Sequence, residues 1–91
     1  MYTLKWTNTF TRTALRFLKK HPELKGQFYS VIKQLETNPN SPSLNLHPLK
    51  GKHKDKLAIS LTYSYRIVIT IILEDRNIIL LDIGTHDHVY K

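Results

Sequence analysis

The stretch LAISLTYSYRIVITIILEDRNIILLDI, residues 57–83, decides the fold. Its central part, Tyr65 to Leu73, is apolar at nearly every position, which is typical of a strand covered on both faces. Before it, large apolar residues alternate with small or polar ones over 57–62, and after a turn at 74–77 another apolar run spans Ile78 to Ile83. Because the connections between these runs are short, the stretch predicts an antiparallel meander of three strands.

The first 37 residues predict one strand and two helices. Alternation from Tyr2 to Trp6 is typical of a short strand with one buried face. Apolar residues recur at helical spacing from Asn8 to Lys20 and again from Pro22 to Thr37, with a short junction between the two segments. The element order is therefore β-α-α-β-β-β, an α+β fold in which a helical hairpin packs on one face of the sheet. Residues 1–91 are expected to form a single domain.

Residues 38–48, NPNSPSLNLHP, are rich in proline and asparagine and predict a loop, with Leu44, Leu46 and Leu49 attaching it to the core. Cysteine is absent, and the sequence contains neither a secretory signal nor an apolar run of membrane-spanning length. These features favour a cytoplasmic protein that does not enter the membrane.

Positive charge is the most informative bulk property. Fourteen Lys and Arg residues against seven Asp and Glu residues give a formal net charge of +7, which favours a polyanionic partner. The segment HPLKGKHKDK, residues 47–56, concentrates this charge in Lys50, Lys52, Lys54 and Lys56, accompanied by His47 and His53. It is either a phosphate-binding loop or a solvated basic loop.

Arg66 is unusual because it begins the most apolar strand, where an unpaired buried charge would be costly. It either reaches solvent or pairs with Asp82, or it presents its guanidinium to a phosphate on the open face of the sheet.

The C-terminal stretch LLDIGTHDHVYK, residues 80–91, places imidazoles and a phenol where an apolar strand breaks at Gly84. Such groups can do acid–base chemistry, whereas the alternative is a polar solvated tail. His86 and His88 would lie on one side of an extended backbone, but no further ligands complete a metal site, so neither a metal nor another cofactor is expected.

Metal-independent RNA cleavage needs a base for the 2′-hydroxyl, an acid for the leaving 5′-oxygen and cations for the charge on phosphorus. The basic loop, the central strand and the C-terminus together contain these groups. Neighbouring antiparallel strands could bring Arg66 and His86 together on one side of the sheet.

The chain resembles the RelE/ParE superfamily of toxins from type II toxin–antitoxin systems along nearly its whole length. The similarity lies in HPLKG at residues 47–51, YRIVI at 65–69 and IGTHDHVY at 83–90, and it favours the branch of RelE, HigB and YafQ-type mRNA interferases. The resemblance implies a RelE-like fold, cleavage of mRNA in the ribosomal A site, and inhibition of translation. It also implies a cognate antitoxin and a toxin–antitoxin heterotetramer on operator DNA.

The resemblance also implies roles for single residues. His47 matches the histidine of the HPL motif and His86 that of the GTH motif, so these two would share acid and base work, with Arg66 stabilising the phosphorane and Tyr90 stacking on a base or orienting phosphate. Contacts to mRNA and ribosomal RNA are expected from Lys50, Lys52, His53, Lys54, Lys56 and Tyr65. The chain departs from the YafQ type at Ser60 and Ser64, where those toxins carry a histidine and an aspartate.

Two other functions fit the same resemblance. The first is a ParE-like inhibitor of DNA gyrase without nuclease activity, for which the histidines would be dispensable. The second is a degenerate member that only binds antitoxin or DNA.

Overall fold

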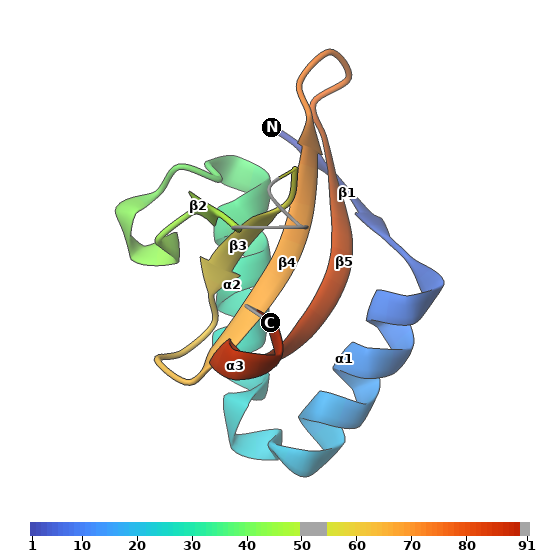
Figure 1. The fold of residues 1–91 in the computed structure, drawn as a ribbon, viewed down its shortest axis with the longest axis vertical. Helices are drawn as coiled ribbons and strands as arrows, with labels where there is room; N and C mark the ends of the chain where they lie inside the picture. The colour runs from blue at the N-terminus through green and yellow to red at the C-terminus, as the bar shows by residue number, and fades with distance from the viewer. Residues whose placement is uncertain (50–54, 90–91) are drawn as a thin grey trace.

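A computed structural model describes residues 1–49 and 55–89, with only the backbone described at His86 and His88. The strands are β1 (Thr3–Trp6), β2 (His47–Pro48), β3 (Leu57–Ser60), β4 (Tyr65–Ile72) and β5 (Asn77–Thr85). The helices are α1 (Asn8–Lys20), α2 (Lys25–Thr37) and the single turn α3 (His86–Val89), with 3-10 turns η1 (Pro22–Leu24) and η2 (Pro42–Leu44). In Figure 1, α2 lies behind the sheet, α1 lies beside β5, and α3 lies in front of the sheet.

The five strands form one mixed sheet in the order β1-β5-β4-β3-β2. Strands β3, β4 and β5 pair antiparallel, which confirms the predicted meander and the central place of β4. Strand β1 joins the free edge of β5 in parallel, and the short β2 extends the other edge by pairing antiparallel with β3. The predicted α+β architecture is confirmed, with β2 and α3 as additions.

Local sequence explains where the two long helices begin. The side chain of Thr7 caps α1 by accepting a hydrogen bond from the backbone N–H of Phe10 at 3.1 Å. The second helix begins three residues later than predicted, because Pro22–Leu24 form a 3-10 turn before α2 starts at Lys25.

The main core lies between the helices and the back of the sheet. Its buried aromatic centre is Phe10 of α1 and Phe28 of α2, whose rings are 6.3 Å apart. The sheet contributes alternate residues of its central strands, including Ile67, Ile69 and Leu80. The predicted anchors of the 38–48 loop are in place, since Leu44 and Leu49 are buried and Leu46 packs on the main core.

A second, smaller apolar cluster covers part of the front face of the sheet. It consists of Leu49, Ala58, Val68 and Val89, with Leu81 packed against them. Val89 belongs to α3, so this helical turn folds back over the front of the sheet. Because Val68 belongs to this cluster, β4 buries apolar side chains on both of its faces.

Strand register determines which residues share the front face. Paired residues of neighbouring strands lie on the same side of a sheet, so His47, Ala58, Val68 and Asp82 form one row. The next row toward the β3–β4 turn is Ser60, Arg66 and Gly84. His47 and Arg66 therefore lie on the same face, with Cα atoms roughly 12 Å apart from standard strand spacings.

Within residues 1–49 and 55–89, no helix is long and apolar enough to cross a membrane.

Candidate functional site

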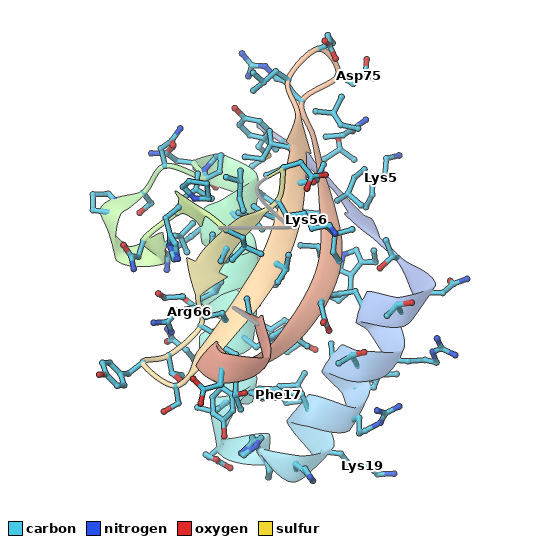
Figure 2. All side chains as sticks on the ribbon, viewed as in Figure 1. Lys5, Phe17, Lys19, Lys56, Arg66 and Asp75 are labelled. Atoms are coloured by element: carbon cyan, nitrogen blue, oxygen red, sulfur yellow. The ribbon has the colours of Figure 1, made fainter. Side chains whose placement is uncertain are left out.

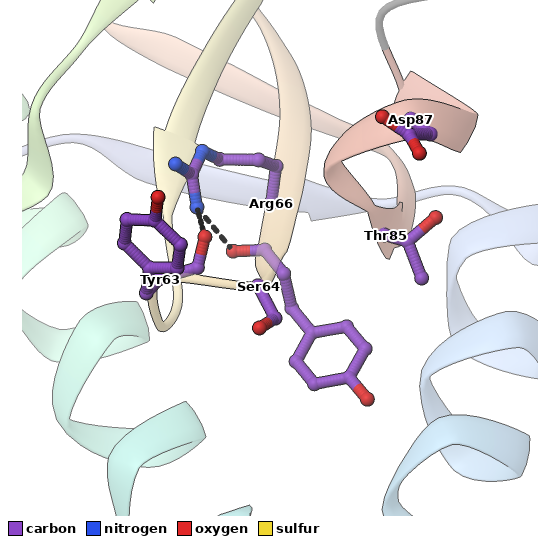
Figure 3. A pocket seen from close by; sticks show the side chains of 6 residues that line it. Tyr63, Ser64, Arg66, Thr85 and Asp87 are labelled. Carbon is purple, nitrogen blue, oxygen red and sulfur yellow. Dashed lines mark hydrogen bonds between the residues drawn. The ribbon is translucent and has the colours of Figure 1, made fainter.

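A pocket of about 390 Å³ opens at the end of the sheet where β4 begins and β5 ends. Three segments form it: the β3–β4 turn, the first residues of β4, and the junction of β5 with α3. Its lining residues are Tyr63, Ser64, Tyr65, Arg66, Thr85 and Asp87. Figure 3 shows Arg66 between the turn on one side and Thr85 and Asp87 on the other.

The guanidinium of Arg66 is held by the backbone of the β3–β4 turn. Its Nη1 donates hydrogen bonds to the carbonyl oxygens of Thr62 at 2.6 Å, Tyr63 at 2.9 Å and Tyr65 at 3.2 Å. Two of these bonds are drawn in Figure 3. Because all three acceptors meet Nη1, they fix the direction of the guanidinium and leave Nη2 outside these bonds.

The charge of Arg66 is buried, and none of the described residues supplies a counter-ion. The residue is only 9% exposed, and no carboxylate of the described residues lies within 4.0 Å of its guanidinium. The pairing with Asp82 considered from the sequence is not made, nor does Arg66 simply reach solvent. Its Nε is fully buried without a hydrogen-bond partner in the described part of the chain. Since burying an unpaired charge is costly, the arrangement favours an anionic ligand at this pocket.

The turn that holds Arg66 is itself well ordered by hydrogen bonds. The N–H groups of Leu61 and Thr62 both donate to the carbonyl of Tyr65, at 3.0 and 3.3 Å. The Thr62 hydroxyl accepts from the N–H of Ser64 at 3.2 Å, and Gln27 of α2 donates to the carbonyl of Leu61 at 3.2 Å. These bonds fix the carbonyl oxygens that face Arg66.

His47 has one ring nitrogen already in use. Its Nδ1 lies 2.7 Å from the carbonyl oxygen of Asn45, and because a carbonyl can only accept, Nδ1 carries the hydrogen. In the neutral ring, Nε2 is then the basic nitrogen. Asn45 adopts the left-handed conformation, with φ of 53°, which directs its carbonyl toward the ring.

Tyr65 lines the pocket, but its ring faces the helices rather than the front of the sheet. The ring contacts Phe17 and His21, with centroids 4.8 and 5.1 Å away, and its hydroxyl lies 3.3 Å from Nε2 of His21. Tyr65 and Arg66 are neighbours in one strand, so their side chains point to opposite faces. The expected RNA contact of Tyr65 therefore stays a prediction.

The other predicted site residues are placed only in part. Lys50, Lys52, His53, Lys54 and Tyr90 lie outside the described residues. Lys56 is half-buried, and its carbonyl accepts the N–H of Leu49 at 3.0 Å, which closes the base of the lysine-bearing segment. Figure 2 shows Lys56 and Arg66.

The backbone at the C-terminal histidines is helical. α3 begins at His86, directly after Thr85, which pairs with Tyr65. The extended backbone considered for a histidine metal site is therefore not present. In the described residues, no group of three or more His, Asp or Glu side chains could hold a metal ion.

The sequence reasoning missed three residues that line the pocket: Tyr63, Thr85 and Asp87. Thr85 and Asp87 flank the predicted site residue His86 in the sequence, and this proximity could have identified them as candidates. Tyr63 lies in the short connection between two predicted strands, and an aromatic side chain in such a turn is unusual enough to indicate a candidate binding residue. Ser60 and Ser64, noted as departures, are both near the site: Ser60 pairs with Arg66, and Ser64 lines the pocket.

Comparison with solved structures shows the same fold in several bacterial toxins. A metal-bound toxin from Helicobacter pylori is 27% identical, with a TM-score of 0.80 over 99% of this chain and 100% of that one. YafQ from Escherichia coli is 13% identical, with a TM-score of 0.79 over the whole of both chains. A YoeB/ParE toxin from Agrobacterium tumefaciens is 15% identical, with a TM-score of 0.76 over 92% of this chain and 98% of that one.

These structural neighbours are RelE/YafQ-like type II toxins, and the fold expected from the resemblance is confirmed. YafQ is also known in a toxin–antitoxin complex with DinJ. No protein-family model and no curated protein sequence matches the chain.

Proposed function

We propose that this protein is the toxin of a type II toxin–antitoxin system and acts as a ribosome-dependent mRNA endonuclease. The observation that carries the proposal is the buried guanidinium of Arg66, which lies in a pocket without a carboxylate partner among the described residues. A phosphate group would supply the missing negative charge and accept hydrogen bonds from the guanidinium fork. The fold shared with solved toxins supports the wider assignment.

The proposed chemistry is metal-independent cleavage by the 2′-hydroxyl of the RNA. Arg66 stabilises the negative charge that develops on the phosphorane. His47 and His86 share the acid and base roles, and the hydrogen bond from His47 Nδ1 to Asn45 makes Nε2 the nitrogen able to take a proton. Tyr90 stacks on a base or orients the phosphate.

The proposal also covers the RNA contacts of the lysine-bearing segment 47–56 and the protein partner of the toxin. Lys50, Lys52, His53, Lys54 and Lys56 hold mRNA and ribosomal RNA through phosphate contacts. The same positive charge attracts an acidic cognate antitoxin, and the resulting heterotetramer binds operator DNA. The structural neighbour YafQ forms a toxin–antitoxin complex with DinJ, which supports an antitoxin partner. The toxin acts in the cytoplasm as a single domain without a cofactor.

Inducible expression followed by primer extension on a reporter mRNA tests this function. The wild-type chain should arrest growth and cut the mRNA at A-site positions, and co-expression of the neighbouring reading frame should prevent both effects. Arg66→Met and His86→Ala should remove cleavage while the proteins stay folded. Arg12→Met is the matched control, because Arg12 is exposed on α1 and is not among the residues that line the pocket.

Two outcomes would contradict the proposal. Growth arrest with intact mRNA and DNA damage would favour the ParE-like gyrase inhibitor, a possibility raised also by the name of the Agrobacterium neighbour. Full toxicity in His86→Ala would remove His86 from the mechanism.

A further inference from the structure

Tyr63 is an aromatic side chain displayed to solvent at the rim of the Arg66 pocket. Its side chain is 93% exposed, far more than Trp6 at 44% or Tyr29 at 57%. It lies in the β3–β4 turn between two small polar residues, Thr62 and Ser64. Burial does not explain the ring, and a tight turn gains nothing locally from a large apolar side chain.

The backbone of Tyr63 links the ring to the guanidinium. The carbonyl of Tyr63 accepts a hydrogen bond from Arg66 Nη1 at 2.9 Å, so the residue that carries the exposed ring also helps to orient the buried cation. The hydrogen bonds that order the turn, which Thr62 Oγ1 and the Tyr65 carbonyl accept, restrain the backbone of Tyr63 as well. Figure 3 shows the Tyr63 ring on the side of Arg66 away from Thr85 and Asp87.

We propose that Tyr63 is a stacking platform for the nucleobase next to the phosphate bound at Arg66. This inference rests on the proposed RNA substrate but does not require cleavage. A base and its neighbouring phosphate need an aromatic face and a cation at a fixed separation, and residues 63 and 66 provide these two groups from one rigid turn.

Stacking of this kind adds affinity with little sequence preference, because every base has a π-face. The guanidinium of Arg66 holds the RNA backbone, and the ring of Tyr63 holds the adjacent base away from the neighbouring bases on which it would otherwise stack. Tyr63 would thereby hold a single-stranded nucleotide in the extended form that in-line attack by the 2′-hydroxyl requires. The phenol hydroxyl has no necessary part in this role.

A binding experiment with an RNA that cannot be cut separates this role from catalysis. The probe is a short single-stranded 2′-O-methyl oligonucleotide containing 2-aminopurine, whose fluorescence falls when the base stacks on an aromatic ring. Wild type and Tyr63→Phe should both quench the probe, whereas Tyr63→Ala should lose the quenching and bind roughly 5- to 150-fold more weakly. Tyr29→Ala, which removes an exposed tyrosine of α2 that does not line the pocket, should bind like wild type.

Salt dependence distinguishes stacking from a phosphate contact. Tyr63→Ala removes no charge, so the slope of log affinity against log salt should stay that of wild type, whereas Arg66→Met should reduce its magnitude by about 0.7. Equal affinity and quenching in wild type and Tyr63→Ala would overturn the proposal, as would the absence of quenching in wild type. Weaker antitoxin binding by Tyr63→Ala with unchanged RNA binding would make the ring an antitoxin contact instead. Cleavage of the reporter mRNA by wild type is measured separately, so failure of the nuclease function would be recognised as such.

Discussion

Arg66 combines features that oppose stability with features that serve binding. Burial of its charge without a described carboxylate partner and the unsatisfied Nε are both unfavourable to the folded state. The carbonyl groups around Nη1 recover part of this cost and at the same time orient the group. Groups that lower the stability of the fold while being held in a defined orientation are typical of functional sites.

Replacing Arg66 should therefore separate stability from binding. In Arg66→Met the side-chain length is kept while the charge is lost, and water can reach the freed carbonyls of the half-exposed turn. We expect the free energy of unfolding to stay within about 1 kcal/mol of wild type or to rise, while RNA binding weakens. Urea denaturation monitored by circular dichroism measures the first quantity, with Arg12→Met as the control. A loss of several kcal/mol would mean that the guanidinium mainly holds the turn together.

The sequence identified Arg66 as an anomaly but not the groups that hold it. Those groups are main-chain carbonyls, and their direction depends on the conformation of the 62–65 turn, which side-chain identity does not encode. Tyr65 shows the opposite situation. Side chains alternate along a strand, so Tyr65 is expected on the face away from Arg66. Its position toward the helices, where it contacts Phe17 and His21, follows from this alternation once the strand is identified.

One threonine links the start of α1 to the sheet by hydrogen bonds. The hydroxyl of Thr7 accepts the N–H of Phe10 as the helix cap and donates to the carbonyl of Leu80 in β5 at 2.7 Å. Thr7→Ala removes both bonds, so we expect it to lower the free energy of unfolding by about 1–2 kcal/mol. Thr7→Ser keeps the oxygen and should cost less than about 0.5 kcal/mol. Equal stability of the two variants in thermal or urea unfolding would show that the cap is unimportant.

Long periodic elements were predictable because many residues specify each of them. The predicted bounds of α1 match the structure, and the apolar central segment from Tyr65 is β4 as expected. Short elements were not: β2 has two residues, and α3 follows β5 without a break. Tertiary contacts stabilise these short elements, as the packing of Val89 in the front cluster shows for α3. No local sequence pattern predicts such elements.

Charged side chains are unevenly arranged over the described part of the chain. The turn between β4 and β5, which contains Glu74 and Asp75, lies at the far end of the sheet from Arg66 (Figure 2). The exposed basic residues of α1 lie on a helix whose apolar side packs in the main core. His47, Arg66 and Asp82 lie on the front face of the sheet, and Asp87 lines the pocket beside Arg66. A polyanion bound at the pocket would therefore meet Arg66 and a carboxylate, and would need further cations for its binding.

This arrangement predicts that the position of the charge, not its total, governs RNA binding. Replacement of Lys50, Lys52, Lys54 and Lys56 by glutamine lowers the net charge from +7 to +3, since 7 − 4 = 3. If each lysine meets one phosphate of single-stranded RNA, the slope of log affinity against log salt should become less negative by about 3. The control replaces Arg12, Arg16, Lys19 and Lys20 of α1 by glutamine, which gives the same net charge. That control should keep the wild-type slope, because the contacts that release counter-ions are retained. Equal slopes for the two variants, measured by fluorescence anisotropy across a salt series, would mean that the RNA responds only to overall charge.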